Sequence, residues 1–191
     1  MEAICLLIFV GSSALYIRYL LWRGAGTTQS DKDRIRLQEG IQLLEKRLYK
    51  EAFGYFNSIL QKEPRCALAL ASRARCYLMQ GDWLHVITDC NKAASLDHCL
   101  DSIYLDKGIA LVHLGEMQDA FVQFDKAVWY FNVNATPNAD AYRWRGITRL
   151  KLGDYTKAEQ DFRKAINLGD ENAAYFLSMR GDSMDTIEID S

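Results

Sequence analysis

Residues 77–97 read YLMQGDWLHVITDCNKAASLD, and residues 149–168 read RLKLGDYTKAEQDFRKAINL. Both stretches belong to a pattern of small residues that recurs after 34, 34 and 38 residues along the chain. Three positions follow it, occupied by Gly40, Ala74, Gly108 and Gly146, by Ala52, Val86, Ala120 and Ala158, and by Ile59, Ala93, Ala127 and Ala165. This period predicts a helix-turn-helix array, because small residues let two helices approach closely and each pair buries its apolar face on the next pair.

Three glycine-acid pairs predict the turns within the repeats. They are Gly81-Asp82, Gly115-Glu116 and Gly153-Asp154. Glycine readily takes the left-handed conformation that ends a helix, and an acidic residue suits the N-terminus of the helix that follows.

Four extra residues, near Asn132 to Thr136, separate the third repeat from the fourth. We expect Pro137 to open the next helix, with Thr136 as its cap. The preceding run Trp129-Tyr130-Phe131 extends the earlier helix and is expected to pack against the fourth repeat, the alternative being an exposed binding patch.

The two quoted stretches resemble the tetratricopeptide repeat, and the resemblance covers about residues 33–180. It implies an all-α, right-handed helix-turn-helix solenoid. The four repeats would span residues 33–66, 67–100, 101–138 and 139–172, with a capping helix at 171–180. The chain departs from the family pattern because only the first repeat ends in the usual proline, Pro64, and because Ile59 is too large for its small-residue position. The second departure predicts a looser first helix pair.

An apolar segment precedes the repeats. Residues 3–22, AICLLIFVGSSALYIRYLLW, are long enough to cross a bilayer core of about 30 Å as one helix. Glu2 precedes this segment and basic residues such as Arg18 and Arg23 follow it, so we expect a single-pass anchor with the repeats in the cytosol, on an organelle outer membrane or a bacterial inner membrane. A cleaved signal peptide or a buried helix are the alternatives. Residues 23–32 are expected to form a flexible linker, and residues 181–191 an acidic, disordered tail that could visit an apolar groove.

Composition and motifs argue against several classes of function. The net charge of −2 and the pI near 5.9 disfavour nucleic-acid binding, which requires a basic stripe. The five cysteines form no C-x-x-C pair, and the three histidines are isolated, so we expect no metal, no cofactor and no catalytic site. Cys90 stands where other repeats carry an aromatic residue, which predicts a small buried hydrophobe. The carboxylates follow helical surface spacing, which predicts a solvated face.

The resemblance implies a protein-binding groove, because the first helix of each pair lines the concave face in this family. The eleven residues that we expect to contact a partner are Leu68, Ala71, Arg75, Leu78, Met79, Leu105, Ile109, Val112, Arg143, Ile147 and Leu150. Leu37, Ile41, Leu44, His113 and Lys151 complete the expected lining. The set is mainly aliphatic, which suits an amphipathic helix or an apolar peptide, unless part of it belongs to the core.

The resemblance also allows one known activity of the family to be tested. Cochaperone members grip the acidic tail of heat-shock chaperones with two asparagines and three basic residues. The matching places here hold Leu37, Ile41, Ser72, Ser102 and Asp106, which predicts no chaperone-tail clamp. We therefore expect a membrane-anchored adaptor that binds a protein partner. A luminal or periplasmic chaperone-like protein and a structural subunit of a membrane complex are the alternatives.

Overall fold

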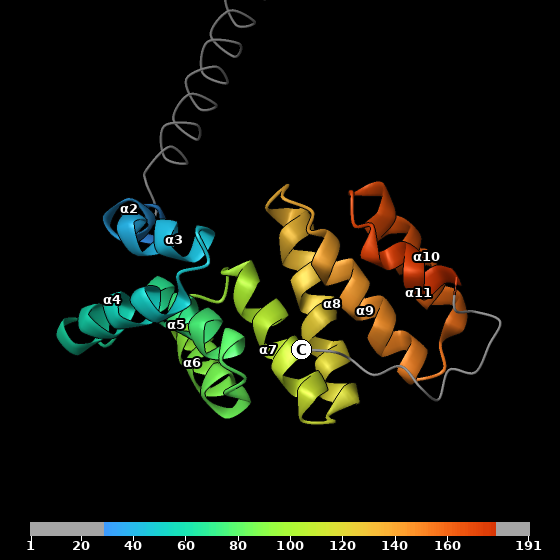
Figure 1. The fold of residues 1–191 in the computed structure, drawn as a ribbon, viewed down its shortest axis with the longest axis horizontal. Helices are drawn as coiled ribbons and strands as arrows, with labels where there is room; N and C mark the ends of the chain where they lie inside the picture. Colours follow the sequence, from blue (N-terminus) through green and yellow to red (C-terminus); the bar gives the residue numbers. More distant parts are fainter. Residues whose placement is uncertain (1–28, 179–191) are drawn as a thin grey trace, which may run out of the picture. The chain divides into compact units, whose positions relative to one another are not determined.

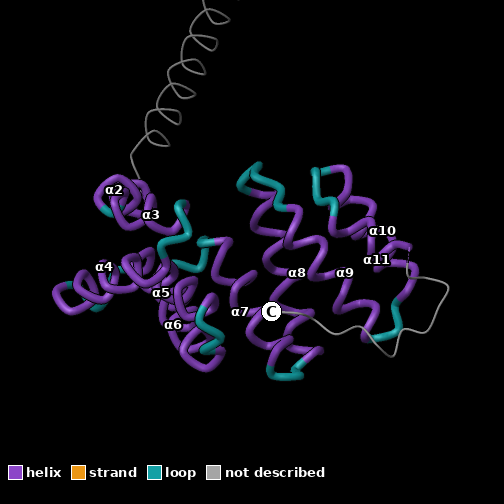
Figure 2. The backbone as a smooth tube through the Cα atoms, in the orientation of Figure 1, coloured by secondary structure: helices purple, strands orange, loops and turns teal. Residues whose placement is uncertain are grey.

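The computed structural model describes residues 29–178. This part of the chain is helical throughout, with short turns between the helices (Figures 1 and 2). The helices are α2 (Gln29–Arg36), α3 (Gln38–Glu45), α4 (Tyr49–Lys62), α5 (Ala67–Met79), α6 (Trp83–Leu96), α7 (Asp101–His113), α8 (Met117–Val133), α9 (Ala139–Lys151), α10 (Tyr155–Asn167) and α11 (Asn172–Ser178).

Successive helices from α3 to α10 form pairs, α3 with α4, α5 with α6, α7 with α8 and α9 with α10. Each pair also packs on the next one, and α11 packs on α10 at the end of the array. The apolar residues between the helices form one continuous core, in which Phe56, Phe124 and Phe162 are among the largest fully buried side chains. The predicted helix-turn-helix array is confirmed for this region.

The small residues lie where two helices meet, as predicted. A Cβ atom on Gly108 would come within 2.5 Å of the Phe124 ring, and one on Gly146 within 2.7 Å of the Phe162 ring. In the second repeat Ala74 takes the place of the glycine, and the place of the phenylalanine is taken by the smaller Cys90, which is 1% exposed. The methyl group of Ala74 thus meets a smaller partner than a phenylalanine, and the prediction that Cys90 is a small buried hydrophobe is confirmed.

The glycines of the three predicted turns have left-handed backbones, with φ of 74° at Gly81, 82° at Gly115 and 84° at Gly153. Asp82 and Asp154 cap the helices that follow, accepting hydrogen bonds from the backbone N–H groups of His85 and Lys157 at 3.3 Å. In the first repeat Arg47 occupies the glycine position and still adopts φ of 58°. A side chain in this conformation is strained, because its Cβ crowds the neighbouring carbonyl.

The predicted start of the fourth repeat is wrong by two residues. Helix α9 begins at Ala139 rather than at Pro137, and its cap is Asn138 rather than Thr136. The Asn138 side chain accepts the backbone N–H of Ala141 at 3.0 Å, a bond that satisfies one of the free donors of the first turn. The extension of α8 through the Trp129-Tyr130-Phe131 run is confirmed.

The chain divides after Arg36 into two compact units. In the first unit α2 begins at Gln29, so the last four residues of the expected linker 23–32 are helical. Asp33 supports this helix by accepting hydrogen bonds from the side chains of Gln29 and Arg36, at 3.1 and 2.9 Å. None of the helices that the structure describes has the length and hydropathy of a membrane span. The expected anchor at residues 3–22 and the expected tail at 181–191 lie outside the described residues.

Candidate partner-binding face

The first helices of the repeats lie next to one another, since α3 packs on α5, α5 on α7 and α7 on α9. The helices α5, α7 and α9 carry all eleven predicted partner-binding residues. Their exposure differs, however. Met79 is 51% exposed, and Leu68, Arg75, Ile109, Arg143 and Leu150 are half-buried. Ala71, Leu78, Leu105, Val112 and Ile147 are buried.

The five buried members of the set belong to the core and offer little surface to a partner. Leu105 and Ile147 are each only 2% exposed and lie in the hydrophobic core. A groove contact must therefore come from the six accessible residues. They are Leu68, Arg75, Met79, Ile109, Arg143 and Leu150.

Arg75 of α5 is paired across the face with Asp106 of α7. Its Nε donates to Oδ2 of Asp106 at 2.9 Å, and its Nη2 lies 2.7 Å from Oδ1. Asp106 is fully enclosed, and this burial raises the pKa of its carboxyl, against the opposing effect of the Arg75 guanidinium. The carboxylate in turn raises the pKa of Arg75. The cation at the centre of the face is thus neutralised by the protein itself.

Arg143 of α9 is neutralised in the same way. Its Nε donates to Asp170 at 2.6 Å and its Nη2 to Asp140 at 2.5 Å. Asp170 also accepts the backbone N–H groups of Asn172 and Ala173, so it joins α9 to the start of α11. A hollow of about 540 Å³ lies here, between Pro137–Asp140 and Leu168–Asn172.

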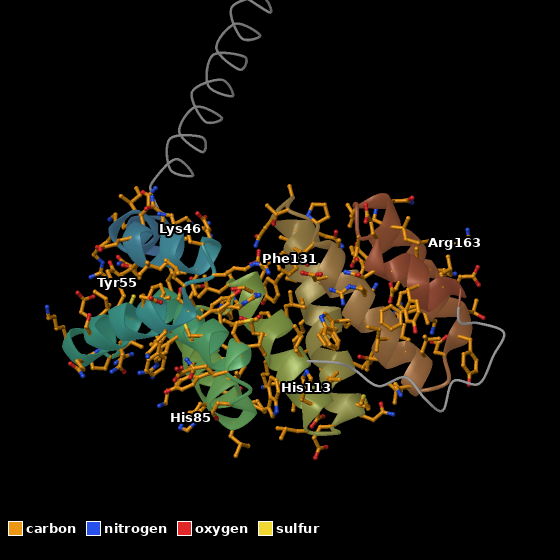
Figure 3. The ribbon with its side chains drawn as sticks, viewed as in Figure 1. Lys46, Tyr55, His85, His113, Phe131 and Arg163 are labelled. Carbon is orange, nitrogen blue, oxygen red and sulfur yellow. The ribbon has the colours of Figure 1, made fainter. Side chains whose placement is uncertain are left out.

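Aromatic side chains near the ends of the helices form a second feature, which the sequence analysis did not find. The ring of His113, the last residue of α7, stacks on Trp83 of α6 at 4.1 Å with 2° between the planes. Trp144 of α9 lies 6.5 Å from His113, so the three rings connect the second, third and fourth repeats. Figure 3 shows the position of His113. Trp83 belongs to a recognisable aromatic position of the repeat, but nothing in the spacing of His113 indicated its partner.

The prediction that the carboxylates form a solvated face is wrong for five of the described ones. Asp33, which pairs with Arg36 within α2, is 8% exposed. In the second unit Asp89, Asp106, Asp161 and Asp170 are buried, with 2%, 2%, 3% and 9% exposure. Each of these four aspartates forms an ion pair with an arginine from a first helix. The two residues of each pair lie 16 to 31 positions apart in the sequence, so surface spacing within one helix cannot reveal the contact.

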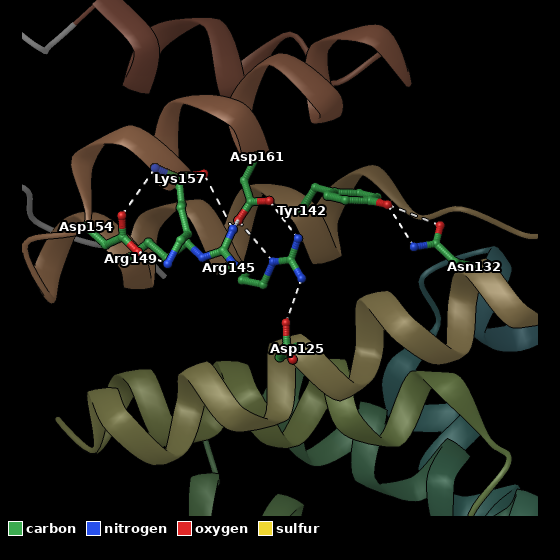
Figure 4. A network of polar contacts seen from close by, with 8 residues as sticks. All are labelled: Asp125, Asn132, Tyr142, Arg145, Arg149, Asp154, Lys157 and Asp161. Carbon is green, nitrogen blue, oxygen red and sulfur yellow. Dashed lines mark hydrogen bonds and ion pairs between the residues drawn. The ribbon is translucent and has the colours of Figure 1, made fainter.

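The buried pairs repeat along the array. Arg73 bonds forward to Asp89 at 2.7 Å and back to Asn57 at 2.9 Å. Arg145 donates two hydrogen bonds forward to Asp161, at 3.0 and 2.7 Å, and one back to Asp125 at 2.8 Å, and Arg149 adds a third bond to Asp161 (Figure 4). An arginine at this position of the first helix therefore binds the second helix of its own repeat and the second helix of the preceding repeat. The signal was present in the sequence as a cation 16 residues from an acid.

The remaining reactive groups have structural surroundings. Burial raises the pKa of the Cys76 thiol to about 11 and that of Cys90 well above its ordinary value, so neither forms a thiolate readily. Cys66 is also buried and Cys99 is exposed. Within residues 29–178 no group of three His, Cys, Asp or Glu side chains is arranged to hold a metal ion.

Residues 139–172 match the model of the tetratricopeptide repeat family. Tetratricopeptide repeat protein 13 of Homo sapiens is 26% identical over 148 residues, which is 74% of this chain and 16% of that protein. The Hsp70-Hsp90 organizing protein of Triticum aestivum is 24% identical over 101 residues, 53% of this chain and 17% of that protein. The chain thus spans less than a fifth of the length of these two relatives.

Two solved structures share the fold. PilF of Pseudomonas aeruginosa superposes with a TM-score of 0.65 at 17% identity, covering 79% of this chain and 68% of that one. The second repeat domain of human RPAP3, solved with the HSP70 peptide SGPTIEEVD, superposes with a TM-score of 0.51 at 20% identity, covering 59% of this chain and 90% of that one. The array from α3 to α11 is therefore an all-α helical solenoid with the fold of these structures, and residues 139–172 within it match one tetratricopeptide repeat.

Proposed function

We propose that this chain is an adaptor that holds an apolar or amphipathic segment of a partner protein on the face formed by α5, α7 and α9. The observation that carries this proposal is the chemistry of the accessible residues. Met79, Ile109 and Leu150 offer aliphatic surface along the face, whereas Arg75 and Arg143 are already neutralised by carboxylates of the chain. An amphipathic helix laid into such a groove buries its apolar side without having to displace an ion pair.

An acidic chaperone tail suits this face poorly. RPAP3 binds an HSP70 peptide, and the wheat relative is named for Hsp70 and Hsp90. The five positions that would grip such a tail here include Asp106, which is buried against Arg75. A tail carboxylate would have to compete with Asp106 for that guanidinium, at the cost of leaving a buried charge unpaired.

We further propose that residues 3–22 anchor the adaptor in a membrane, with the repeats in the cytosol. The support is the 20-residue apolar segment, the acid before it and the basic residues after it. A luminal or periplasmic chaperone-like protein with a cleaved signal, and a structural subunit of a membrane complex, are the alternatives.

The groove is tested with Met79→Asp and Ile109→Asp combined in the full chain. Each aspartate places a charge where an apolar partner surface would dock, so capture of partner proteins by the tagged chain should be lost, as measured by quantitative mass spectrometry. Leu84→Asp is the control, since Leu84 is 68% exposed on a second helix. The groove proposal is wrong if the double variant keeps its helical circular dichroism and still captures the partners that the control captures. Loss of capture at moderate salt would indicate recognition of charge instead.

The anchor is tested separately by carbonate extraction and by protease treatment of intact organelles or spheroplasts. The chain should stay in the membrane pellet, and the repeats should be digested from the cytosolic side. Asn134-Ala135-Thr136 matches the N-glycosylation sequon. Glycosylation at Asn134, or a mature N-terminus near Gly24, would replace this topology by the secreted alternative.

A further inference from the structure

The outer side of the array carries a lysine at the same position of three successive repeats. Lys92 of α6, Lys126 of α8 and Lys164 of α10 each stand two residues after the buried position that Phe124 occupies in the third repeat. Two residues turn a helix by about 200°, so each lysine points away from the core, and all three are exposed. Because the first helices pack on one another, these second helices form the outer side of the array.

The ammonium groups of these three lysines have no carboxylate partner within residues 29–178. Acids beside them on α8 and α10 are bound by arginines instead. Asp125, next to Lys126, accepts a hydrogen bond from Arg145 at 2.8 Å, and Glu159 accepts one from Arg163 at 2.8 Å. Although the whole chain has a net charge of −2, this side of it offers positive charge that its own acids do not neutralise.

Apolar side chains of α8 surround the middle lysine. Val122, Trp129 and Val133 are 46%, 58% and 61% exposed. Together with Lys126 they lie within about 60° of one another around the helix, on the side away from the core. An exposed acid, Asp119, lies in the first turn of α8, so a contact with negative charge must use the later turns.

Other repeats of the same chain show that the fold does not need these apolar residues. The residues at the position of Val122 are Gly54, Thr88 and Gln160, and those at the position of Trp129 are Gln61, Ser95 and Asn167. Positions that are small or polar elsewhere are thus apolar only in the third repeat, at the centre of the row of lysines.

The Trp129-Tyr130-Phe131 run is divided between the core and this surface. Phe131 is 8% exposed (Figure 3), and Tyr130 stacks on Tyr104 of α7 at 4.9 Å. The Trp129 ring stands edge-on to Tyr130 at 4.7 Å and is otherwise largely exposed. The prediction that the whole run packs against the fourth repeat is therefore wrong for Trp129.

We propose that the outer surface formed by the three lysines, Val122, Trp129 and Val133 lies against the headgroups of an anionic membrane. Lysines close to a bilayer are attracted to anionic lipids, and an indole ring favours the boundary between headgroups and acyl chains. Successive second helices are separated by a first helix, which places the lysines about 15–20 Å apart. This spacing suits an extended anionic surface rather than a single phosphate group or the closely spaced phosphates of a nucleic acid.

The inference rests on the proposed anchor, because the membrane that the outer surface contacts is the one in which residues 3–22 would lie. The six residues 23–28 span at most about 22 Å. Helix α2 adds about 12 Å, so Leu37, where the array begins, stays within roughly 35 Å of the bilayer. A tether this short gives the array a high effective concentration at the lipid surface, and a few weak contacts then suffice to hold it there.

The test places a polarity-sensitive fluorophore at the outer surface of the full chain. Val133→Cys is labelled in a chain that also carries Cys5→Ser and Cys99→Ser, and the three remaining cysteines are buried. The labelled chain is reconstituted in vesicles of phosphatidylcholine with or without phosphatidylserine. Emission should be several-fold stronger, and at shorter wavelength, in the vesicles that contain phosphatidylserine, and high salt should remove the difference.

Two matched controls identify the surface and the charges. A label at Met79→Cys, on the first-helix side, should emit equally in both kinds of vesicle. A triple variant that removes the outer lysines should lose the difference at position 133; it carries Lys92→Gln, Lys126→Gln and Lys164→Gln. A second triple variant loses the same charge elsewhere and should keep the difference; it carries Lys46→Gln, Lys107→Gln and Lys151→Gln.

Carbonate extraction of the same vesicles tests the anchor independently, since it reports whether residues 3–22 hold the chain in the bilayer and not where position 133 lies. Equal emission at position 133 in the two kinds of vesicle would overturn the inference even if the chain resists extraction. So would an unchanged difference in the first triple variant with helical circular dichroism intact. A rise in emission that requires added cytosolic protein would assign the outer surface to a protein partner and also overturn it.

Discussion

The third and fourth repeats use the same apolar contact but different polar ones. Gly108 meets Phe124 in the third repeat as Gly146 meets Phe162 in the fourth. In the fourth, Arg145 forms a two-pronged ion pair with the buried Asp161 and a further one with Asp125. In the third, the equivalent residues are Lys107 and Gln123, and Lys107 bonds only to Asn91, at 2.7 Å on the surface.

This difference distinguishes the apolar contact that both repeats share from the buried ion pair that only the fourth repeat makes. The glycine-phenylalanine contact is present in both, so it belongs to the packing geometry. The buried ion pair is present in one of them, so a helix pair can form without it. Once a charge has been buried, however, removing its partner is expensive because the remaining charge is left without water or counter-ion.

The largest expected effect comes from breaking the pair in the fourth repeat. Asp161→Ala leaves Arg145 and Arg149 without their shared buried partner and should lower the free energy of unfolding by about 3–5 kcal/mol. Gln123→Ala at the same position of the third repeat should cost less than about 1 kcal/mol. Urea unfolding followed by circular dichroism measures both. Equal losses of unfolding free energy in the two variants would show that Asp161 does not stabilise the fourth repeat more than Gln123 stabilises the third.

The shared contact is tested by enlarging the glycine. Gly108→Leu should cost about 1–3 kcal/mol or more, because even its Cβ would lie 2.5 Å from Phe124. Gly54→Ala is the control, since nothing lies within 4 Å of a Cβ there. Removing the flexibility of a helical glycine should stabilise α4 by about 0.5–1 kcal/mol. If Gly108→Leu melts at the wild-type temperature, the close approach of α7 and α8 is not required.

The apolar part of this comparison was predicted from the sequence, whereas the polar part was not, although the spacing of 16 residues between arginine and aspartate in the second and fourth repeats carried a signal for it. Small residues at a fixed period identify the helix pairs, because each contact lies at the same place in every repeat. The Arg75–Asp106 pair joins different repeats and occurs once, so periodicity carries no signal for it. For the candidate face, the family resemblance indicated which residues of each helix line it but not the burial of Leu105 and Ile147, which depends on how closely adjacent repeats stack.

The turn of the first repeat differs from the turns of the later ones in a way that a single substitution can remove. Arg47 adopts φ of 58° where Gly81 has 74°. Since a side chain in this region costs about 1–2 kcal/mol, Arg47→Gly should raise the free energy of unfolding by about 0.5–1 kcal/mol, after the entropic cost of glycine. Gly81→Arg should lower it by a similar amount. Thermal melts of the two variants should move in opposite directions, and a fall for Arg47→Gly would mean that the Arg47 side chain makes a contact worth more than the strain.

The smallest effect concerns the aromatic contact between the second and third repeats. Burial lowers the pKa of His113 below its ordinary value of 6.5, because the imidazolium is poorly solvated there. The folded chain then binds this proton less readily than the unfolded chain, so its contribution to stability is intact above pH 6.5 and is lost as the pH falls through the interval down to the lowered pKa. Between pH 7.5 and 5.5 the wild type should lose more stability than His113→Gln, which cannot be protonated. Urea unfolding at both pH values, followed by tryptophan fluorescence because His113 stacks on Trp83, gives the difference. A wild type that loses less than His113→Gln on acidification would show that the attraction between the imidazolium and the indole outweighs its desolvation.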